Sequence, residues 1–220
     1  MNMCMRKAKI VSAITLLCCL TGAAQAQDNW QLKKEEEGIL VYTGSSPNSD
    51  FKSIKVECTV KAKTTQLVAF LLDLDAQRDW VYNNKNTSLI KKIDANEMIF
   101  YSEVSVPWPC TNRDYISHIT ITQPNPKLVT IDAHAEPGLL PAKEGKVRVK
   151  DSKAHWEVTR AGSDLLKIVY TVQFDPSGAI PAWLTNMFVT KGPLLTFRKL
   201  REVVARPVYA NASVPFIKEL

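Results

Sequence analysis

Between residues 38 and 174 the chain is a succession of short apolar runs, and their alternation constrains the fold more than any other feature. In the run over 51–60, Ile54 and Val56 fall on one face, whereas Lys55 falls on the other. A period of two is typical of a β-strand with one buried face. Because connections of hairpin length separate the runs, they favour an antiparallel sheet over repeated βαβ units. We predict strands at 38–42, 51–60, 88–93, 98–106, 115–122, 128–134, 147–149, 155–159 and 165–174.

Two segments follow the helical period instead. Leu67, Phe70 and Leu71 recur three or four residues apart behind Thr64, which predicts an amphipathic helix over 64–74 with Thr64 as its cap. A second helix is expected after Pro181, a good first-turn residue. Its wide apolar stripe comprises Trp183, Leu184, Met187, Phe188, Leu194, Leu195, Phe197, Leu200, Val203 and Val204.

Gly192-Pro193 interrupts this second helix and predicts a kink, because proline removes a backbone donor and clashes with the preceding turn. We expect the tail after Pro207 to be loose.

Residues 1–26 have the three parts of a secretory signal peptide. A basic start ends at Lys9, an apolar run follows over 10–20, and Ala24-Gln25-Ala26 is a small-residue cleavage site. The apolar run is shorter than the roughly 20 residues that a bilayer requires. We therefore expect cleavage after Ala26 and a secreted or periplasmic protein, with an uncleaved N-terminal anchor as the alternative.

Loss of residues 1–26 would change the charge and the cysteine content. The formal net charge of +6 would fall to +3, because that segment holds three cations and no acid. A mildly basic chain lacks the electrostatic footprint of most nucleic-acid binders, so no nucleic-acid partner is expected. Cys58 and Cys110 would remain, and free thiols are favoured over one disulfide. The remaining 194 residues suffice for one domain, 27–206, followed by a tail, 207–220.

Sequence motifs of common enzymes are missing. The chain has no Gly-rich phosphate loop, no Gly-x-Ser-x-Gly elbow and no Cys-x-x-Cys pair. His118, His134 and His155 fall on separate predicted strands without zinc-type spacing, although His134 and Glu136 could supply two ligands of a site. Because structural zinc normally has four protein ligands and catalytic zinc three, we expect no metal and no cofactor. The histidines are interpreted as surface or hydrogen-bonded groups.

Several residue strings resemble the START family, the lipid-transfer domains related to the steroidogenic acute regulatory protein. They are Gly38-Ile39-Leu40-Val41-Tyr42, Asp79-Trp80, Val106-Pro107 followed by Asn112-Arg113-Asp114, and Asp175-Pro176-Ser177-Gly178-Ala179-Ile180-Pro181-Ala182-Trp183-Leu184-Thr185-Asn186. Their order and spacing cover residues 30–205, and Gly192-Pro193 is similar to a pair in phosphatidylcholine-carrying members. The resemblance implies an α+β helix-grip fold. In that fold a curved antiparallel sheet wraps around a long C-terminal helix and leaves an internal apolar tunnel.

The resemblance also suggests which residues line the tunnel. The candidate ligand-binding residues are Trp80, Tyr82, Tyr101, Glu103, Ser105, Tyr115, Ile119, Tyr170, Trp183 and Met187. For the tryptophans, core packing is the alternative. Candidate gates are the loop 137–145, with Pro137 and Gly138, and the last helix, which could swing on Gly192 and Pro193.

Glu103 is the most informative of these residues. Strand alternation puts it on one face with Tyr101 and Ser105, opposite Val104, and the resemblance implies that its face points to the tunnel. A buried acid must be paired or hydrogen-bonded, so Glu103 would position a polar group of the ligand. Sterol-carrying relatives pair this acid with a cation on the next strand, where this chain has Ile119. A solvent-facing Glu103, or one bonded to Tyr or Ser neighbours, is the alternative.

Arg113 and Asp114 match the Arg-Asp pair of the family. Because adjacent strand residues point to opposite faces, we expect them not to pair with each other and assign both a structural role.

We favour a lipid-binding and lipid-transfer protein that holds one hydrophobic ligand, such as a phospholipid, a sterol-like or another lipid. It would act as a monomer, without covalent chemistry, and touch membrane surfaces transiently. One alternative is a helix-grip enzyme of the aromatase/cyclase type, with Glu103 and a tyrosine as acid–base groups. Another is an interaction module with a filled core. A polar dyad in the cavity would favour the enzyme, and a missing cavity would favour the module.

Overall fold

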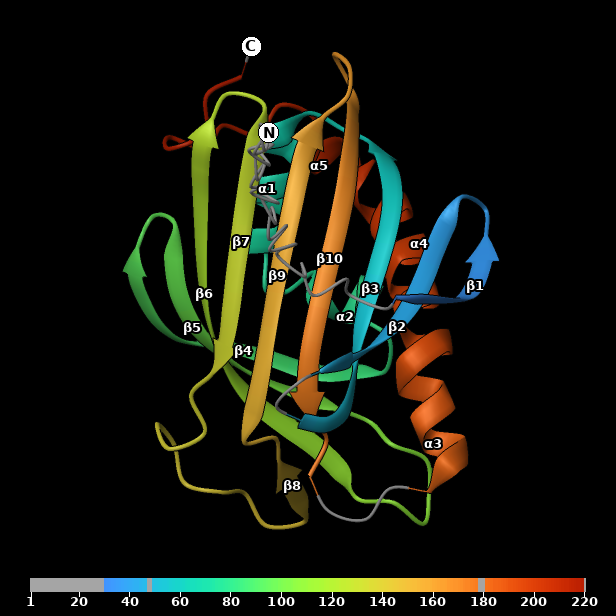
Figure 1. Cartoon of the computed structure of the whole chain (residues 1–220). Helices are drawn as coiled ribbons and strands as arrows, with labels where there is room; N and C mark the ends of the chain where they lie inside the picture. The colour runs from blue at the N-terminus through green and yellow to red at the C-terminus, as the bar shows by residue number, and fades with distance from the viewer. Residues whose placement is uncertain (1–29, 47–48, 178–180, 220) are drawn as a thin grey trace, which may run out of the picture.

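The computed structural model describes residues 30–46, 49–177 and 181–219 (Figure 1). The expected signal peptide, 1–26, lies outside these residues.

One twisted, mainly antiparallel sheet makes up most of the described chain (Figure 1). Its strands are β1 (Gln31–Glu36), β2 (Ile39–Ser46), β3 (Ser49–Lys61), β4 (Asn84–Asp94), β5 (Glu97–Val104), β6 (Asn112–Asn125), β7 (Leu128–Ala135), β8 (Lys146–Arg148), β9 (Asp151–Arg160) and β10 (Leu165–Asp175). The order is β1-β2-β3-β10-β9-β7-β6-β5-β4, and β8 pairs with β6 in parallel. All nine predicted strands are present, so the prediction of an antiparallel sheet is confirmed.

Strand β1 was not predicted, because it has no apolar face to bury. Five of its six residues are exposed, including Leu32, and it forms one edge of the sheet through its pairing with β2. The hairpin between them turns at Glu37 and Gly38, which both have positive φ, of 54° and 69°. Strand β4 forms the opposite edge.

In Figure 1 a helical segment near the C-terminus runs along the right-hand side of the sheet, from α3 at the lower right up to α4. It comprises α3 (Ala182–Asn186), the π-helical turn η1 (Met187–Lys191) and α4 (Gly192–Val204). Phe197 and Leu200 of α4 are almost fully buried, and the Phe197 ring centroid lies 5.2 Å from that of Trp156 and 5.4 Å from that of Tyr170. The predicted apolar stripe therefore packs on the sheet, which confirms the helix-grip fold.

The Gly192-Pro193 interruption falls where the π-turn meets α4. The Gly192 N–H donates to the carbonyl oxygen of Met187, five residues back, which closes the π-turn. Pro193 then lies in the first turn of α4, directly after the π-turn, where the helical hydrogen-bond register changes. A Cβ on Gly192 would lie 3.1 Å from the Met187 carbonyl oxygen and 3.3 Å from the Tyr82 ring, so this position has little room for a side chain.

Two shorter helices precede β4, namely α1 (Thr64–Leu72) and α2 (Gln77–Trp80). Helix α1 begins at Thr64 as predicted, but it ends at Leu72 rather than at residue 74, and Lys63 rather than Thr64 occupies the N-cap. The Lys63 N–H donates to the Gln66 side chain at 3.3 Å, and Thr64 is buried as the first helical residue. No helix in the described part of the chain is long and apolar enough to span a bilayer.

The expectation of a loose tail is wrong. Tyr209 of the short helix α5 (Pro207–Ala210), and Val214 and Ile217 after it, are each only 6% exposed and join the main core. The Lys218 backbone N–H donates to the Gln123 side chain at 2.7 Å. Apolar residues separated by turns carry no helical or strand period, so sequence periodicity gave no signal for this packing.

Candidate ligand-binding cavity

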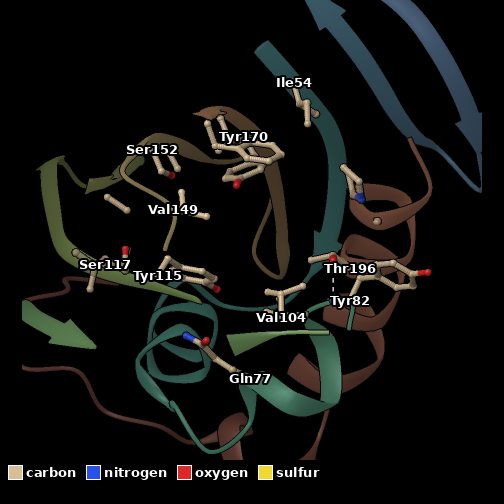
Figure 2. A pocket seen from close by; sticks show the side chains of 18 of the residues that line it. Ile54, Gln77, Tyr82, Val104, Tyr115, Ser117, Val149, Ser152, Tyr170 and Thr196 are labelled. Carbon is tan, nitrogen blue, oxygen red and sulfur yellow. Dashed lines mark hydrogen bonds between the residues drawn. The ribbon is translucent and has the colours of Figure 1, made fainter. Parts of the chain in front are cut away.

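A cavity of about 320 Å³ lies between the concave face of the sheet and the helical segment. Its walls come from β3, β5, β6, β7, β9 and β10, from α2, and from η1 and α4. Figure 2 shows side chains from these elements converging on one space. The volume is in the range of pockets that hold one small molecule.

Small residues on adjacent strands explain why this space stays open. Ala133 of β7 pairs directly with Ala154 of β9, and both line the cavity together with Ala135 and Ser152. Larger side chains here would fill the gap between the sheet and α4. The remaining wall is mostly apolar and includes Ile54, Phe100, Ile119, Ile131, Val172, Phe174 and Phe188.

A few uncharged polar side chains interrupt the apolar wall. Figure 2 shows the hydroxyl groups of Tyr115 and Tyr170 directed into the cavity and the Gln77 amide at its border. Burial raises the pKa of Tyr115, and burial together with the nearby Tyr115 raises that of Tyr170. Both phenols therefore stay protonated and can donate hydrogen bonds. Thr196 accepts a hydrogen bond from the Tyr82 backbone N–H at 3.0 Å, which ties α4 to the segment after α2.

Arg113 is the only charged side chain among the described residues that line the cavity. It is 5% exposed and donates from Nε to the Pro176 carbonyl oxygen and from Nη2 to that of Ser177, both at 3.3 Å. A third donation, from Nη1, goes to the Thr111 carbonyl oxygen. All three acceptors are neutral backbone carbonyl groups. These hydrogen bonds therefore hold the guanidinium in place without neutralising its charge.

The structure brings five of the predicted residues to the cavity, namely Trp80, Tyr82, Tyr115, Ile119 and Tyr170. Gly192 and Pro193 also line it. Met187 lies in η1 and Ser105 after β5, and neither belongs to the described lining. The Trp183 side chain lies outside what the structure describes. Whether any of the lining residues binds a ligand stays a prediction.

Tyr101 and Glu103 lie on the other face of β5, so the expected orientation of this strand is wrong. Phe100 and Val104 face the cavity instead. The Glu103 carboxylate, 6% exposed, pairs with Lys146 at 2.9 Å and Lys85 at 3.3 Å. It also accepts a hydrogen bond from the Asn112 side chain at 2.9 Å. Burial alone would raise the pKa of Glu103, but these three donors outweigh it and hold the pKa below its ordinary value of 4.5.

The loop proposed as a gate also lies on this convex face. Neither Pro137 nor Gly138 lines the cavity, and Leu140 packs on the small apolar cluster of Ile99, Tyr101 and Ile116.

Arg148 holds the loop there. It donates to both carboxylate oxygens of Asp114, at 2.9 and 3.1 Å, and to the carbonyl oxygens of Pro137, Leu140 and Pro141. Asp114 therefore pairs with Arg148 and not with Arg113, which agrees with the expected opposite orientations.

All three histidines lie on the convex face as well. His118 of β6 is directly opposite His134 of β7, and Glu136 reaches both rings. His155 of β9 contacts the Asp132 carboxylate at 2.7 Å. Cys58 and Cys110, the cysteines of the described residues, are free thiols, and Cys58 is buried.

Two features of the cavity were missed by sequence reasoning, although a signal for each was present. Arg113 shares the strand parity of Tyr115 and Ile119, which were both chosen as candidates, so parity alone points it inward. Ala133 and Ala135 are small residues at alternate positions of a strand, a pattern that leaves space on one face.

The fold and the cavity together define a class, that of helix-grip proteins with an apolar ligand cavity under the C-terminal helix. The START domain model matches residues 16–208, and the chain belongs to the START family.

A crystal structure of a STAR-related lipid transfer protein from Xanthomonas axonopodis is similar, with 32% identity and a TM-score of 0.74, over 81% of this chain and 100% of that one. An uncharacterized protein of Pseudomonas aeruginosa is 30% identical over 85% of this chain and 92% of its own length. Mouse phosphatidylcholine transfer protein is 28% identical over 79% of this chain and 80% of its own.

Proposed function

We propose that this protein binds one lipid molecule in the cavity and transfers it between membranes. The observation that carries the proposal is an apolar cavity whose described lining contains one charged side chain, Arg113. An apolar wall with a few placed polar groups is the usual composition of a small-molecule site. The similarity to lipid transfer proteins supports the same function.

Arg113 would select an anionic group on the lipid. Its guanidinium has five N–H donors, and the three neutral carbonyl acceptors leave donors free for a phosphate or carboxylate. The hydroxyl groups of Tyr115 and Tyr170, protonated because burial raises their pKa, could donate further hydrogen bonds. We therefore propose a phospholipid or another lipid with an acidic head group in preference to a neutral sterol.

Transfer would need no chemical step. Moving an acyl chain from a bilayer into the cavity exchanges one apolar medium for another, so little of the roughly 0.8 kcal/mol per buried methylene acts as a net driving force. The cavity would instead remove the barrier of exposing the chain to water during transit.

Trp108 is a candidate for contact with the membrane surface. It is 90% exposed and stands between Pro107 and Pro109 in the loop from β5 to β6. The same loop supplies the Thr111 carbonyl oxygen that Arg113 binds, so it connects directly to the cavity wall. Tryptophan favours the membrane–water interface.

The gate would be the helical segment, because the loop 137–145 is held on the convex face by Arg148. Gly192 and Pro193 line the cavity and follow a π-turn, a feature that often marks functional sites in helices. A disulfide that clamps α4 to the sheet should abolish lipid exchange, and unaltered exchange would refute the gate.

We also propose that the chain is exported and cleaved after Ala26, on the basis of the signal-peptide pattern. N-terminal mass mapping of the protein from a periplasmic or secreted fraction tests this, and a mass that retains residues 1–26 would contradict it.

Native mass spectrometry of protein purified without detergent, followed by solvent extraction, is the decisive test of the function. A stoichiometric lipid is expected. A protein that stays bare after incubation with mixed liposomes would contradict lipid carriage.

Head-group selection is tested on the unmodified protein by competition between phosphatidylcholine and diacylglycerol with identical acyl chains. We expect a preference of roughly tenfold or more for the phosphate-bearing lipid, which corresponds to about 1.4 kcal/mol. Equal uptake would refute the role of Arg113 while leaving lipid binding intact.

The cyclase-type alternative would have to use the tyrosines, since the described lining contains no Asp, Glu, His or Cys side chain. The raised pKa values of Tyr115 and Tyr170 make these two phenols acids rather than bases at neutral pH. The filled-core alternative does not fit a cavity of about 320 Å³.

A further inference from the structure

Two histidines and a glutamate converge on the convex face of the sheet, on the side away from the cavity. His118 and His134 are paired across β6 and β7, with ring centroids 4.8 Å apart. Glu136 follows directly after β7, and its backbone N–H donates to the Ile116 carbonyl oxygen at 2.9 Å, which continues the pairing of the two strands. The position of all three side chains is therefore set by sheet register rather than by a loose loop.

The potential ligand atoms face one another. Glu136 Oε1 lies 3.1 Å from His134 Nε2 and 3.5 Å from His118 Nδ1. One atom from each of the three residues lies within 4.8 Å of the others. In a tetrahedral site with bonds of 2.0–2.1 Å, two ligand atoms are separated by about 3.3 Å. The two distances to Glu136 lie on either side of this value. The ligand atoms as a set are spread over up to 4.8 Å, so the two imidazole rings would have to turn toward each other to bind one cation.

A fourth residue orients His118. Its Nε2 atom lies 2.6 Å from Glu97 Oε1. In the tautomer whose Nε2–H donates to this carboxylate, the Nδ1 lone pair is directed to the side of Glu136 and His134. Histidines that bind metals usually donate their other ring N–H to a carboxylate or carbonyl in this way. This contact is independent of the cluster itself and favours the same conclusion.

We infer that His118, His134 and Glu136 bind a divalent transition-metal cation, with Glu97 as the positioning residue of His118. Two imidazoles and one carboxylate suit Zn²⁺, and a water molecule would complete four-coordination. Imidazole ligands also suit Cu²⁺ and Ni²⁺, so the class of ligand is the divalent transition metals. Two carboxylates, Glu97 and Glu136, favour a cation at this place. The positive charge of Lys153, the cross-strand neighbour of His134, acts against cation binding.

The site would bridge two strands that form the cavity wall. Ile119 on β6 and Ala133 and Ala135 on β7 line the cavity, while their sequence neighbours His118 and His134 would hold the cation on the opposite side. A ligand that binds only the folded chain stabilises it, so the cation should raise the unfolding temperature. The inference does not depend on lipid binding, since the two sites occupy opposite faces of the sheet.

Isothermal titration of Zn²⁺ into full-length protein, metal-stripped and without a histidine tag, tests the site at pH 7.5. We expect one cation per chain. His134→Ala and Glu136→Gln should each weaken binding at least tenfold, and Glu97→Gln, an outer-shell change, should weaken it by roughly tenfold or more.

His155→Ala is the matched control. His155 lies on the neighbouring strand β9 and also contacts two carboxylates, Asp132 at 2.7 Å and Glu157 at 3.7 Å, but no second histidine contacts its ring among the described residues. Its replacement should leave Zn²⁺ affinity unchanged. Equal losses in His155→Ala and His134→Ala would refute the site, as would the absence of Zn²⁺ binding to the unmodified protein.

X-ray absorption of the Zn²⁺ complex of the unmodified protein provides a check that needs no variant. Two imidazole nitrogens at about 2.0–2.1 Å are expected. A first shell of oxygen atoms only, without histidine, would refute the inference even if titration gave one cation per chain.

Discussion

The concave and convex faces of the sheet are built from neighbouring residues of the same strands, yet their chemistry is opposite. The concave face has Ile119, Ala133 and Ala154 on the cavity wall. The residues next to Ala133 and Ala154 on the convex face are His134 and His155, which contact carboxylates. A single layer of sheet therefore separates the apolar cavity wall from an ionic network, and the alternation of side chains makes this separation possible. Neighbouring substitutions should consequently act on different properties.

The largest effect is expected from Arg148→Met on the convex face. The substitution leaves the buried Asp114 carboxylate, whose side chain is 1% exposed, without its paired guanidinium. Breaking a buried ion pair from one side costs about 3–5 kcal/mol of unfolding free energy. Urea unfolding at pH 7 measures this loss of unfolding free energy. The control Lys85→Met removes a cation that is 56% exposed beside Glu103 and should cost less than about 1 kcal/mol. Equal losses would mean that the burial of Asp114 does not matter.

Adjacent residues of β9 test the two faces directly. Ala154→Phe should fill the cavity and reduce the lipid that copurifies by roughly tenfold, about 1.4 kcal/mol of binding free energy. His155→Phe introduces the same ring one residue away on the convex face and should leave lipid occupancy unchanged. Native mass spectrometry of both variants gives the answer, and an equal loss in the two would break the comparison.

Trp108 belongs to neither face and should affect only membrane contact. Trp108→Ala should weaken binding to phospholipid vesicles by roughly threefold to tenfold, because the indole favours the interface. Unfolding free energy should stay within about 0.5 kcal/mol, as for other exposed positions. Vesicle sedimentation and urea unfolding provide the two measurements. Undiminished sedimentation would place the membrane contact elsewhere.

The smallest effect concerns acid sensitivity. Since Glu103 has a folded pKa below 4.5, it contributes stability that is complete above the unfolded pKa, near 4.5, and is lost as the pH falls through the lower folded pKa. Glu103→Gln should therefore be less stable at pH 7 and should lose less stability between about pH 5 and pH 3 than the unmodified protein. Thermal unfolding across this range measures the slope, and an unchanged slope would contradict the pairing with Lys146 and Lys85.

The alternation of apolar residues was sufficient to predict every described strand except β1, but not which face of β5 points to the cavity. Tyr101 and Glu103 were correctly placed together and opposite Val104. Their face was nevertheless assigned wrongly, since both faces of β5 are buried. The apolar cluster of Ile99 and Tyr101 is covered by the loop that carries Leu140, a contact between residues far apart in the sequence. Periodicity divides the residues of β5 between two faces. Contacts with the distant loop determine which of the two faces is covered by that loop and which one lines the cavity.

The candidate site was predicted best on strands of which alternate residues line the cavity. Tyr115 and Ile119 on β6, and Tyr170 on β10, were chosen and do line the cavity. Arg113 was assigned a structural role, which its carbonyl contacts support, but its place on the lining was not anticipated. Pairs such as His118 with His134 depend on the register of β6 and β7, which sequence alone does not fix.

Among the described strands the sheet does not close on itself, so β1 and β4 have no strand partner on their outer sides in this part of the chain. Such edges invite edge-to-edge association between molecules. Lysines occur along both strands, at Lys33 and Lys34 of β1 and at Lys91 and Lys92 of β4, and the pairing of each with its neighbour contains register shifts. Charge and irregularity of this kind discourage the addition of another strand. The two edges where the backbone of the described sheet is open are thus protected against the addition of a strand from another molecule.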